Sequence, residues 1–380
     1  MKKPSFSSCT QGISPQDWQE IDDLLALLKC ESRFQLGYPF TKDFDYSPLF
    51  PFLRYSVNNA GDPFVPGISL KLHSRAFEAE VLAWFAKLFR FPWDKTWGYV
   101  TGGGTEGNLY GLYLARELHP DGIVYYSRDT HYSVPKNLRL LRMPGIPIES
   151  QSNGEVDYRN LHENVHRHIP AIVFANIGTT MKEAVDRVER IRNILSDLSV
   201  SASYIHADAA LSGMTLPFID DSPSFDFQSG IDSISVSGHK FIGSPIPCGI
   251  VLVKRENVSN VTRPIEYIDT LDATLSGSRN GITPLFLWYA IHKYGRQGFR
   301  TKVRQCLDRA EYAVTGLQKV GCKAWRNPHA ITVVIPRPPS FIVRKWQIAV
   351  NGEDAHIIIM PGVTTELIDE FIADMREDHG

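Results

Sequence analysis

A lysine beside an apolar segment is the first candidate for chemistry in this chain. Lys240 ends the run SVSGHK and follows residues 231–236, an apolar segment typical of a buried strand. Gly238 and Gly243 leave space for a ligand near it, and His239 adds a polar ring. An amine in such a pocket loses its proton readily and can attack a carbonyl carbon to form a Schiff base. The alternative for a lysine at this position is an exposed surface residue.

An aspartate at the end of another apolar segment is the second candidate. Asp208 closes the run YIHAD and is followed by Ala209 and Ala210. A carboxylate buried there needs a cationic partner, or else it serves as the N-cap of the next helix. Beside a Schiff-base lysine, the partner can be the ring nitrogen of pyridoxal phosphate, which a carboxylate keeps protonated so that the ring acts as an electron sink. The two alanines leave room for a flat cofactor.

A glycine-rich turn is the third candidate. Residues 101–108 read TGGGTEGN and run into a segment compatible with a helix, so free backbone N–H groups would face an anion. The turn lacks the Lys-Ser/Thr ending of a nucleotide P-loop and the G-x-G-x-x-G spacing of a dinucleotide fold. Together with Lys240 and Asp208, it predicts a seat for the cofactor phosphate.

The histidines divide into two kinds. His131 lies in the loop DTHYS after an apolar segment, and a flat imidazole there can lie on a pyridine ring, although a lone loop histidine is usually exposed. His162, His166 and His168 have the spacing of a metal set. They stand in a charged stretch without a carboxylate or thiolate arranged beside them. We interpret these three as a solvated helix face and predict no metal site.

The elements that must position these residues alternate along the middle of the chain. Short apolar runs, which predict buried strands, are separated by polar periodic segments such as the helical pattern over 186–198. This alternation indicates βαβ units and a mostly parallel sheet that is covered on both faces. The predicted strands are residues 123–126, 171–175, 204–206, 231–236 and 249–254.

The flanking segments complete the predicted organisation. Apolar residues spaced by three and four predict helices over 16–29, 78–89 and 303–321, and apolar runs at 330–335 and 355–360 predict strands of a small terminal domain. We therefore divide the chain into an N-terminal arm (1–60), a large cofactor-binding domain (61–295) and a small C-terminal α/β domain (296–380).

Composition excludes several classes of protein. The 380 residues are 43% hydrophobic and 22% charged, as expected of a packed globular chain. Forty basic residues against 42 acidic ones leave no electrostatic footprint for nucleic acid. We find no apolar run of the ~20 residues that span a membrane, and MKKPSFSSCTQG is not typical of a secretory signal. Five scattered cysteines form neither a disulfide frame nor a zinc knuckle, so we expect a cytoplasmic enzyme.

Taken together, these motifs resemble the group II pyridoxal-phosphate amino-acid decarboxylases of fold type I, from about Gly37 to the C-terminus. The segments YIHADAALSGM, SVSGHKFIGSPIPCGI, GGTEGN, RDTHYSV, FANIGTT and GSRNG are similar to the branch that contains bacterial histidine decarboxylases and plant serine decarboxylases. The resemblance implies a large domain with a mostly parallel seven-stranded sheet and a small C-terminal domain. It also implies a homodimer, with residues 276–281 reaching the partner's cofactor phosphate.

The resemblance further implies roles for single residues. Lys240 is similar to the lysine that holds the cofactor, Asp208 to the partner of the pyridine nitrogen, and His131 to the histidine that stacks on the ring and contacts the substrate. Tyr267 corresponds to a tyrosine that returns a proton to the substrate carbon. The other cofactor-binding positions implied are Gly103, Gly104, Thr105, Thr180, Ala210, Ser237 and His239.

Different segments of the chain resemble enzymes that act on different substrates. The stretch around Asp208 is closer to the histidine enzymes, whereas residues 58–64, 285–291 and 344–361 are closer to the serine enzymes. Ile282 stands where both branches usually carry histidine, which opens the pocket to an apolar amino acid if this position lines it. We expect decarboxylation of histidine to histamine, with serine or an apolar amino acid as alternatives. Another pyridoxal-phosphate carbon–carbon lyase and a non-catalytic binding protein are the competing classes.

Overall fold

The computed structural model describes residues 12–65 and 68–377. Cys9 lies outside the described residues. So does nearly all of the N-terminal segment MKKPSFSSCTQG, for which we expect no secretory signal. Cys30, Cys248, Cys306 and Cys322 are free thiols, and only Cys30 is exposed. Within the described part of the chain, no helix combines the length and the apolar character needed to cross a membrane.

A seven-stranded sheet forms the centre of the molecule, with the strand order β1-β7-β6-β5-β4-β2-β3. Strand β7 is antiparallel to both of its neighbours, β1 and β6, and all other neighbouring strands are parallel. This confirms the predicted mostly parallel sheet. The strands are β1 (Thr96–Thr101), β2 (Ile123–Ser127), β3 (Gly145–Ile148), β4 (Ala171–Asn176), β5 (Ser203–Asp208), β6 (Ser233–Ser237) and β7 (Gly249–Lys254).

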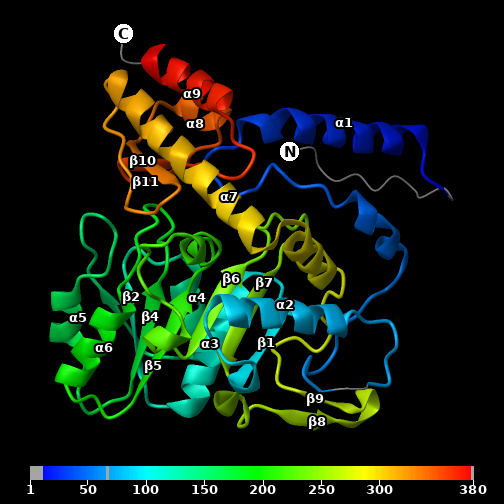
Figure 1. Ribbon diagram of the computed structural model, residues 1–380, viewed down its shortest axis with the longest axis vertical. Helices are drawn as coiled ribbons and strands as arrows, with labels where there is room; N and C mark the ends of the chain where they lie inside the picture. Colours follow the sequence, from blue (N-terminus) through cyan, green and yellow to red (C-terminus); the bar gives the residue numbers. More distant parts are fainter. Residues whose placement is uncertain (1–11, 66–67, 378–380) are drawn as a thin grey trace.

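Alternating side chains of this sheet enter two separate hydrophobic clusters. On β4, Ile172 and Phe174 join one cluster, whereas Val173 and Ala175 join the other. The first cluster contains residues of α3 (Gly104–Leu118) and α4 (Ser133–Leu141). The second contains residues of α2 (Arg75–Leu88), α5 (Tyr158–Asn164), α6 (Val188–Asp197) and α7 (Thr283–Lys319). Helices therefore cover both faces of the sheet, as expected of βαβ units (Figure 1).

Helix α7 connects the large sheet to a smaller C-terminal part (Figure 1). It is kinked at Gly295, where φ is 55° and ψ is −175°, at the predicted end of the large domain. The C-terminal part holds an antiparallel sheet with the order β10-β12-β11, covered by helices, and the division into domains stays a prediction. Its elements are β10 (Thr332–Pro336), α8 (Ser340–Lys345), β11 (Ala349–Asn351), β12 (Asp354–Ile358) and α9 (Thr365–Glu377).

The N-terminal arm begins with helix α1 (Pro15–Glu31), which Ser14 and Asp17 start with a capping box. Every residue of α1 is described, and none of them is buried. Figure 1 shows the helix beside the C-terminal part, away from the large sheet. At the opposite end of the molecule lies a hairpin of β8 (Arg263–Ile265) and β9 (Thr270–Asp272), joined by the short helix η8 (Glu266–Ile268).

Short 3-10 helices make up most of the remaining connections. They are η1 (Ser32–Phe34), η2 (Ser47–Arg54), η3 (Trp93–Lys95), η4 (Ser212–Met214), η5 (Leu216–Phe218), η6 (Phe227–Ser229) and η7 (Arg255–Val258).

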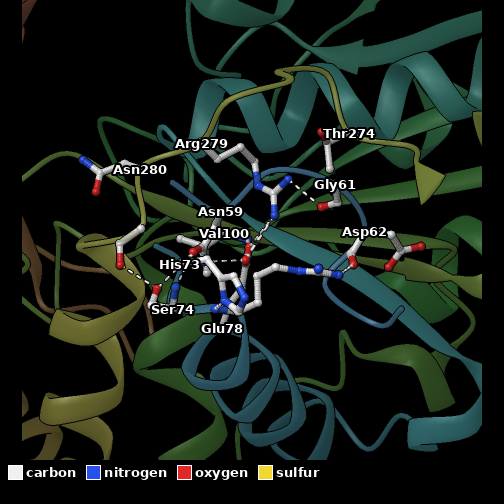
Figure 2. A network of polar contacts seen from close by, with 12 residues as sticks. Asn59, Gly61, Asp62, His73, Ser74, Glu78, Val100, Thr274, Arg279 and Asn280 are labelled. Atoms are coloured by element: carbon white, nitrogen blue, oxygen red, sulfur yellow. Dashed lines mark hydrogen bonds and ion pairs between the residues drawn. The ribbon is translucent and has the colours of Figure 1, made fainter. Parts of the chain in front are cut away.

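A buried ion pair between Glu78 of α2 and Arg279 joins distant parts of the large domain (Figure 2). Their side chains are 1% and 3% exposed. The Glu78 carboxylate also accepts from Asn59 Nδ2 and Val100 N, both at 2.8 Å, and Arg279 donates to Gly61 O at 2.9 Å. We call these five residues the Glu78–Arg279 network. It holds the segment before α7 against α2, β1 and the chain around residue 60.

Candidate active site

A cavity of about 390 Å³ lies beyond the carboxyl ends of β4, β5 and β6, between the large sheet and the C-terminal part. Ligand sites in open α/β sheets occur at this edge. Thr332 and His356 close the cavity from the small sheet, and Gly37 closes it from the N-terminal segment. The sequence-predicted residues that line it are Gly104, Thr105, His131, Thr180, Asp208, Ala210, Ser237, His239 and Lys240.

Lys240 follows β6 by three residues and is half-buried at the wall of the cavity. Burial lowers the pKa of this amine, while the carboxylates of Asp208 and Glu183 act in the opposite direction. The backbone carbonyl of Lys240 accepts a hydrogen bond from Thr41 Oγ1 at 2.9 Å, which anchors the loop. A lowered pKa increases the fraction of neutral amine, the form that attacks a carbonyl.

Asp208 is the last residue of β5 and is 8% exposed. Its Oδ2 accepts from Asn108 Nδ2 at 2.7 Å and its Oδ1 accepts from the Ala210 backbone N–H at 3.1 Å. Both carboxylate oxygens are therefore held in place. Because no α-helix begins here, the N-cap alternative does not apply, and the carboxylate faces the cavity that Lys240 also lines.

The glycine-rich turn leads directly into α3, with Gly103 as the N-cap and Gly104 as the first helical residue. A Cβ on Gly104 would stand 2.7 Å from Ser237 Oγ, so glycine is needed for this close approach. The helix N-terminus and the side chains of Thr105, Ser237 and His239 then meet at one side of the cavity. Free N–H groups and hydroxyls at a helix N-terminus suit a phosphate.

His131 lines the cavity with its ring orientation set by neighbours. Its Nδ1 accepts from the Ser133 backbone N–H at 3.3 Å and lies 2.7 Å from Ser133 Oγ. The neutral ring therefore carries its proton on Nε2. Burial lowers the pKa of His131, opposed by the carboxylate of Asp208, which favours this neutral form. The preceding residue, Thr130, donates to Asn176 Oδ1 at 2.9 Å and so ties the loop to the end of β4.

Three predicted residues lie outside this group. The described residues that line the cavity include neither Gly103, which only begins α3, nor Tyr267. Tyr267 lies in η8 with 83% of its surface exposed, so its catalytic role stays a prediction. Ile282 is 7% exposed and packs in the core at the start of α7, so the premise that it lines this pocket fails.

The three clustered histidines are exposed, and only one of them lies on a helix. His162 belongs to α5, whereas His166 and His168 follow its end at Asn164, so the expected common helix face is wrong. The described residues contain no group of three His, Cys, Asp or Glu side chains that could hold a metal ion.

Sequence reasoning did not single out several residues of the site. Asn108 contacts Asp208 from one turn inside α3, and His206 stands two positions before Asp208 on the same side of β5. Glu183 reaches the cavity from the loop after β4 with a positive φ of 50°. Nδ1 of His356 lies 3.0 Å from Met181 O, and Nε2 of the same ring lies 3.0 Å from Gly37 O. Period-two spacing on β5 could have identified His206 as a neighbour of the site.

The donor set of the cavity fits pyridoxal phosphate. An amine with a lowered pKa, a fixed carboxylate and an anion-binding helix end line one enclosure. These are the groups that the aldehyde, the pyridine nitrogen and the phosphate of this cofactor require. The fold and the site thus define a pyridoxal-phosphate enzyme of α/β architecture.

Comparison with known proteins narrows this class. Residues 73–324 match the model of the pyridoxal-dependent decarboxylase conserved domain. The chain belongs to the pyridoxal-dependent decarboxylase family and is a carboxy-lyase. The predicted family and cofactor are thereby confirmed.

The chain is similar in sequence to bacterial histidine decarboxylases and similar in fold to several enzymes of solved structure. Histidine decarboxylase of Mesorhizobium japonicum is 49% identical over 362 residues, covering 95% of this chain and 98% of that protein. Histidine decarboxylase of Morganella morganii is 47% identical, covering 96% and 98%. Among solved structures, L-methionine decarboxylase from Streptomyces sp. 590 is similar with a TM-score of 0.87 and 25% identity, covering 98% and 97%. A sphingosine-1-phosphate lyase from Burkholderia pseudomallei shares the fold, with a TM-score of 0.83 and 18% identity.

Proposed function

We propose that this protein decarboxylates L-histidine to histamine and CO₂. The observation that carries the proposal is the identity of 46–49% to histidine decarboxylases of several bacteria, over more than nine-tenths of both chains. The methionine enzyme is much less similar in sequence, at 25% identity.

Each residue of the site would have a separate role in the reaction. The bound cofactor would supply an electron sink for the charge that CO₂ leaves behind. Lys240 would hold the cofactor aldehyde through its neutral amine and release it when the substrate amine arrives. Asp208 would accept a hydrogen bond from the protonated pyridine nitrogen. The neutral ring of His131 would lie against the cofactor and present its Nε2–H to the substrate.

Glu183 supports recognition of an imidazole. Its Oε2 accepts from the backbone N–H groups of Ile331 and Thr332, at 3.0 and 2.8 Å, whereas its Oε1 accepts only from Ser212 Oγ, at 3.1 Å, within the described residues. A lone pair on Oε1 therefore remains for an N–H of the substrate ring. A site that hydrogen-bonds a substrate group rejects analogues that lack it.

A panel of amino acids tests this function. The purified protein is loaded with pyridoxal phosphate and incubated with each proteinogenic amino acid, and both CO₂ and the amine are measured. We expect histamine to form with the highest kcat/KM. A higher kcat/KM with serine, methionine or leucine would overturn the choice of substrate, and a keto product would indicate a different reaction.

We also propose that the active enzyme is a cytoplasmic homodimer in which Tyr267 serves the partner's cavity. The apolar side chains of α1 support a second copy, because they are 49–57% exposed on a helix with no buried residue among its described positions. Tyr267 is likewise exposed outside the cavity of its own chain. The exposed α1 residues are Trp18, Ile21, Leu24, Leu25, Leu27 and Leu28.

Mixed dimers test the shared site. Lys240→Ala and Tyr267→Phe subunits are expected to be nearly inactive when each forms a dimer alone. Co-expressed, they should regain activity, because one cavity of each mixed dimer combines an intact Lys240 with the partner's intact Tyr267. No recovery in mixed dimers, or a monomeric mass for the active enzyme in sedimentation, would contradict the proposal.

A further inference from the structure

A chain of buried hydrogen bonds lies behind Asp208. Asn108 Nδ2 is 2.7 Å from Asp208 Oδ2, and Asn108 Oδ1 is 2.9 Å from His206 Nε2. The chain ends at Ser233, whose Oγ lies 2.7 Å from His206 Nδ1. It therefore joins α3, β5 and β6 beneath the cavity.

We propose that Asn108 and His206 are positioning residues that hold the Asp208 carboxylate in the orientation needed to bind the cofactor's pyridine nitrogen. This inference rests on the proposed role of Asp208 and does not depend on which amino acid is the substrate.

The chemistry of the donors allows one order of protons along the chain. An ionised Asp208 only accepts, so Asn108 donates through Nδ2 and turns its Oδ1 toward His206. Because Oδ1 only accepts, His206 must carry a proton on Nε2. Its Nδ1 then accepts from the Ser233 hydroxyl. Every bond in the chain is satisfied by a neutral imidazole, so the carboxylate at its end remains the chain's single charge.

Burial keeps this order fixed. His206 and Ser233 are 0% exposed and Asn108 is 2% exposed. Burial lowers the pKa of His206 to about 3, so the ring stays neutral at physiological pH. Gly111 of α3 leaves the space for the ring, because a Cβ there would stand 2.1 Å from His206 Nδ1. The His206 ring is therefore enclosed by α3 and the sheet. Because the ring cannot turn, its Nε2–H fixes the orientation of the Asn108 amide.

The chain of hydrogen bonds determines how the Asp208 carboxylate is oriented. Asn108 occupies Oδ2 on one side, and the Ala210 backbone N–H occupies Oδ1 on the other. Without His206, the Asn108 amide could rotate and present its oxygen to Asp208. That rotation would replace an attraction with a repulsion and turn the carboxylate away from the pyridine nitrogen. His206 thus prevents a local rearrangement at a distance from the reacting atoms.

The test compares His206→Leu with His206→Gln in the holoenzyme. Leucine removes the Nε2 donor, whereas glutamine can supply an N–H to Asn108 Oδ1. For His206→Leu we expect kcat to fall at least about tenfold with little change in KM, and the dissociation constant of pyridoxal phosphate to rise about tenfold, as when outer partners of a functional group are lost. His206→Gln should restore most of both, and the pH titration of the cofactor absorbance band should shift in the leucine variant alone.

Two further variants keep the test decisive. Asn108→Ala places a good helix former in α3 and should reproduce the loss of kcat and cofactor affinity even if His206→Leu does not fold. Tyr110→Phe is the matched control, since Tyr110 is buried on the same helix as Asn108 and its hydroxyl has no hydrogen-bond partner within the described residues. It should leave both quantities unchanged. Wild-type kcat and cofactor affinity in Asn108→Ala would overturn the inference, whereas failure of wild-type enzyme to decarboxylate histidine would overturn only the proposed substrate.

Discussion

The large domain contains two buried networks of polar side chains, and the two networks have different roles. The chain behind Asp208 is neutral along its length and ends in one carboxylate at the edge of the cavity. The Glu78–Arg279 network pairs its two charges inside the protein, where the Glu78 side chain is 1% exposed and also accepts from Asn59 and Val100 (Figure 2). A charge left facing a cavity is available to a ligand, whereas a charge neutralised inside the protein joins segments. The difference separates a functional site from a structural one at similar burial.

The Glu78–Arg279 network has a second consequence, for the segment that the family resemblance assigns to the partner's cofactor. Arg279 lies within residues 276–281, and Ser74 Oγ donates to Gly281 O at 2.6 Å. The network therefore sets the position of this segment in its own chain, before any partner binds.

Asp208→Asn is expected to have the largest effect on activity. The fold should be retained, because the oxygen of the new amide can still accept from Asn108, but a neutral side chain no longer keeps the pyridine nitrogen protonated. We expect more than nine-tenths of kcat to be lost, a barrier increase of at least about 1.4 kcal/mol. Steady-state kinetics and thermal unfolding measure the two properties. Retention of more than a tenth of wild-type kcat would refute the ring-nitrogen role.

Glu78→Ala should instead act on stability. Removing one partner of a buried ion pair leaves Arg279 uncompensated, and this costs about 3–5 kcal/mol of unfolding free energy. Glu80→Ala on the same helix is the control, because its side chain is 60% exposed, and it should cost less than about 1 kcal/mol. Denaturant titration of both variants measures the difference. If Glu78→Ala were no less stable than Glu80→Ala, the structural role of the network would be wrong.

Gly111→Ala should disturb the chain behind Asp208 by crowding alone. The new Cβ meets the His206 ring, and overpacking of this kind costs about 1–3 kcal/mol. We expect a lower melting temperature together with weaker cofactor binding. Gly316→Ala is the control, since its Cβ would crowd Ile372 of α9 at 2.4 Å and neither residue is among the described residues that line the cavity. Equal cofactor affinity in the two variants would indicate that the His206 ring moves without consequence.

The smallest expected effect is a pH dependence. The pKa of His206 is about 3 in the folded protein, against an ordinary value of 6.5. Between these values the unfolded chain binds a proton that the folded protein does not, so stability falls as the pH falls. The contribution lost between pH 6.5 and 5.5 is about 1 kcal/mol. His206→Gln should lack it, which denaturant titrations at the two pH values can test. An identical pH dependence in both proteins would indicate that folding does not lower the pKa of His206.

Much of the fold follows from the sequence because buried parallel strands are continuous apolar runs. The run GIVLVK predicted β7, whereas β1 was missed because TWGYVT mixes polar residues with Gly98. That glycine is required by packing across the sheet, since its Cβ would stand 2.2 Å from Val251 O. Such a contact depends on the tertiary structure and leaves no local pattern.

The same reasoning explains which site residues were found. Lys240 follows a strand and Asp208 ends one, so each has a local signal. Asn108 meets Asp208 from 100 positions away in the chain, a contact that no spacing indicates. No sequence pattern indicates where Ile282 lies, because only the packing of α7 shows that this side chain enters the core.

Every proposed role in the cavity depends on Lys240 as the residue that holds the cofactor, and covalent labelling tests this directly. Reduction of the holoenzyme with sodium borohydride converts the imine between lysine and pyridoxal phosphate into a stable amine, which peptide mass spectrometry can locate. We predict the label on the peptide that contains Lys240, and its absence from Lys240→Ala. A label on another lysine, with Lys240 unmodified in active enzyme, would contradict the proposed site.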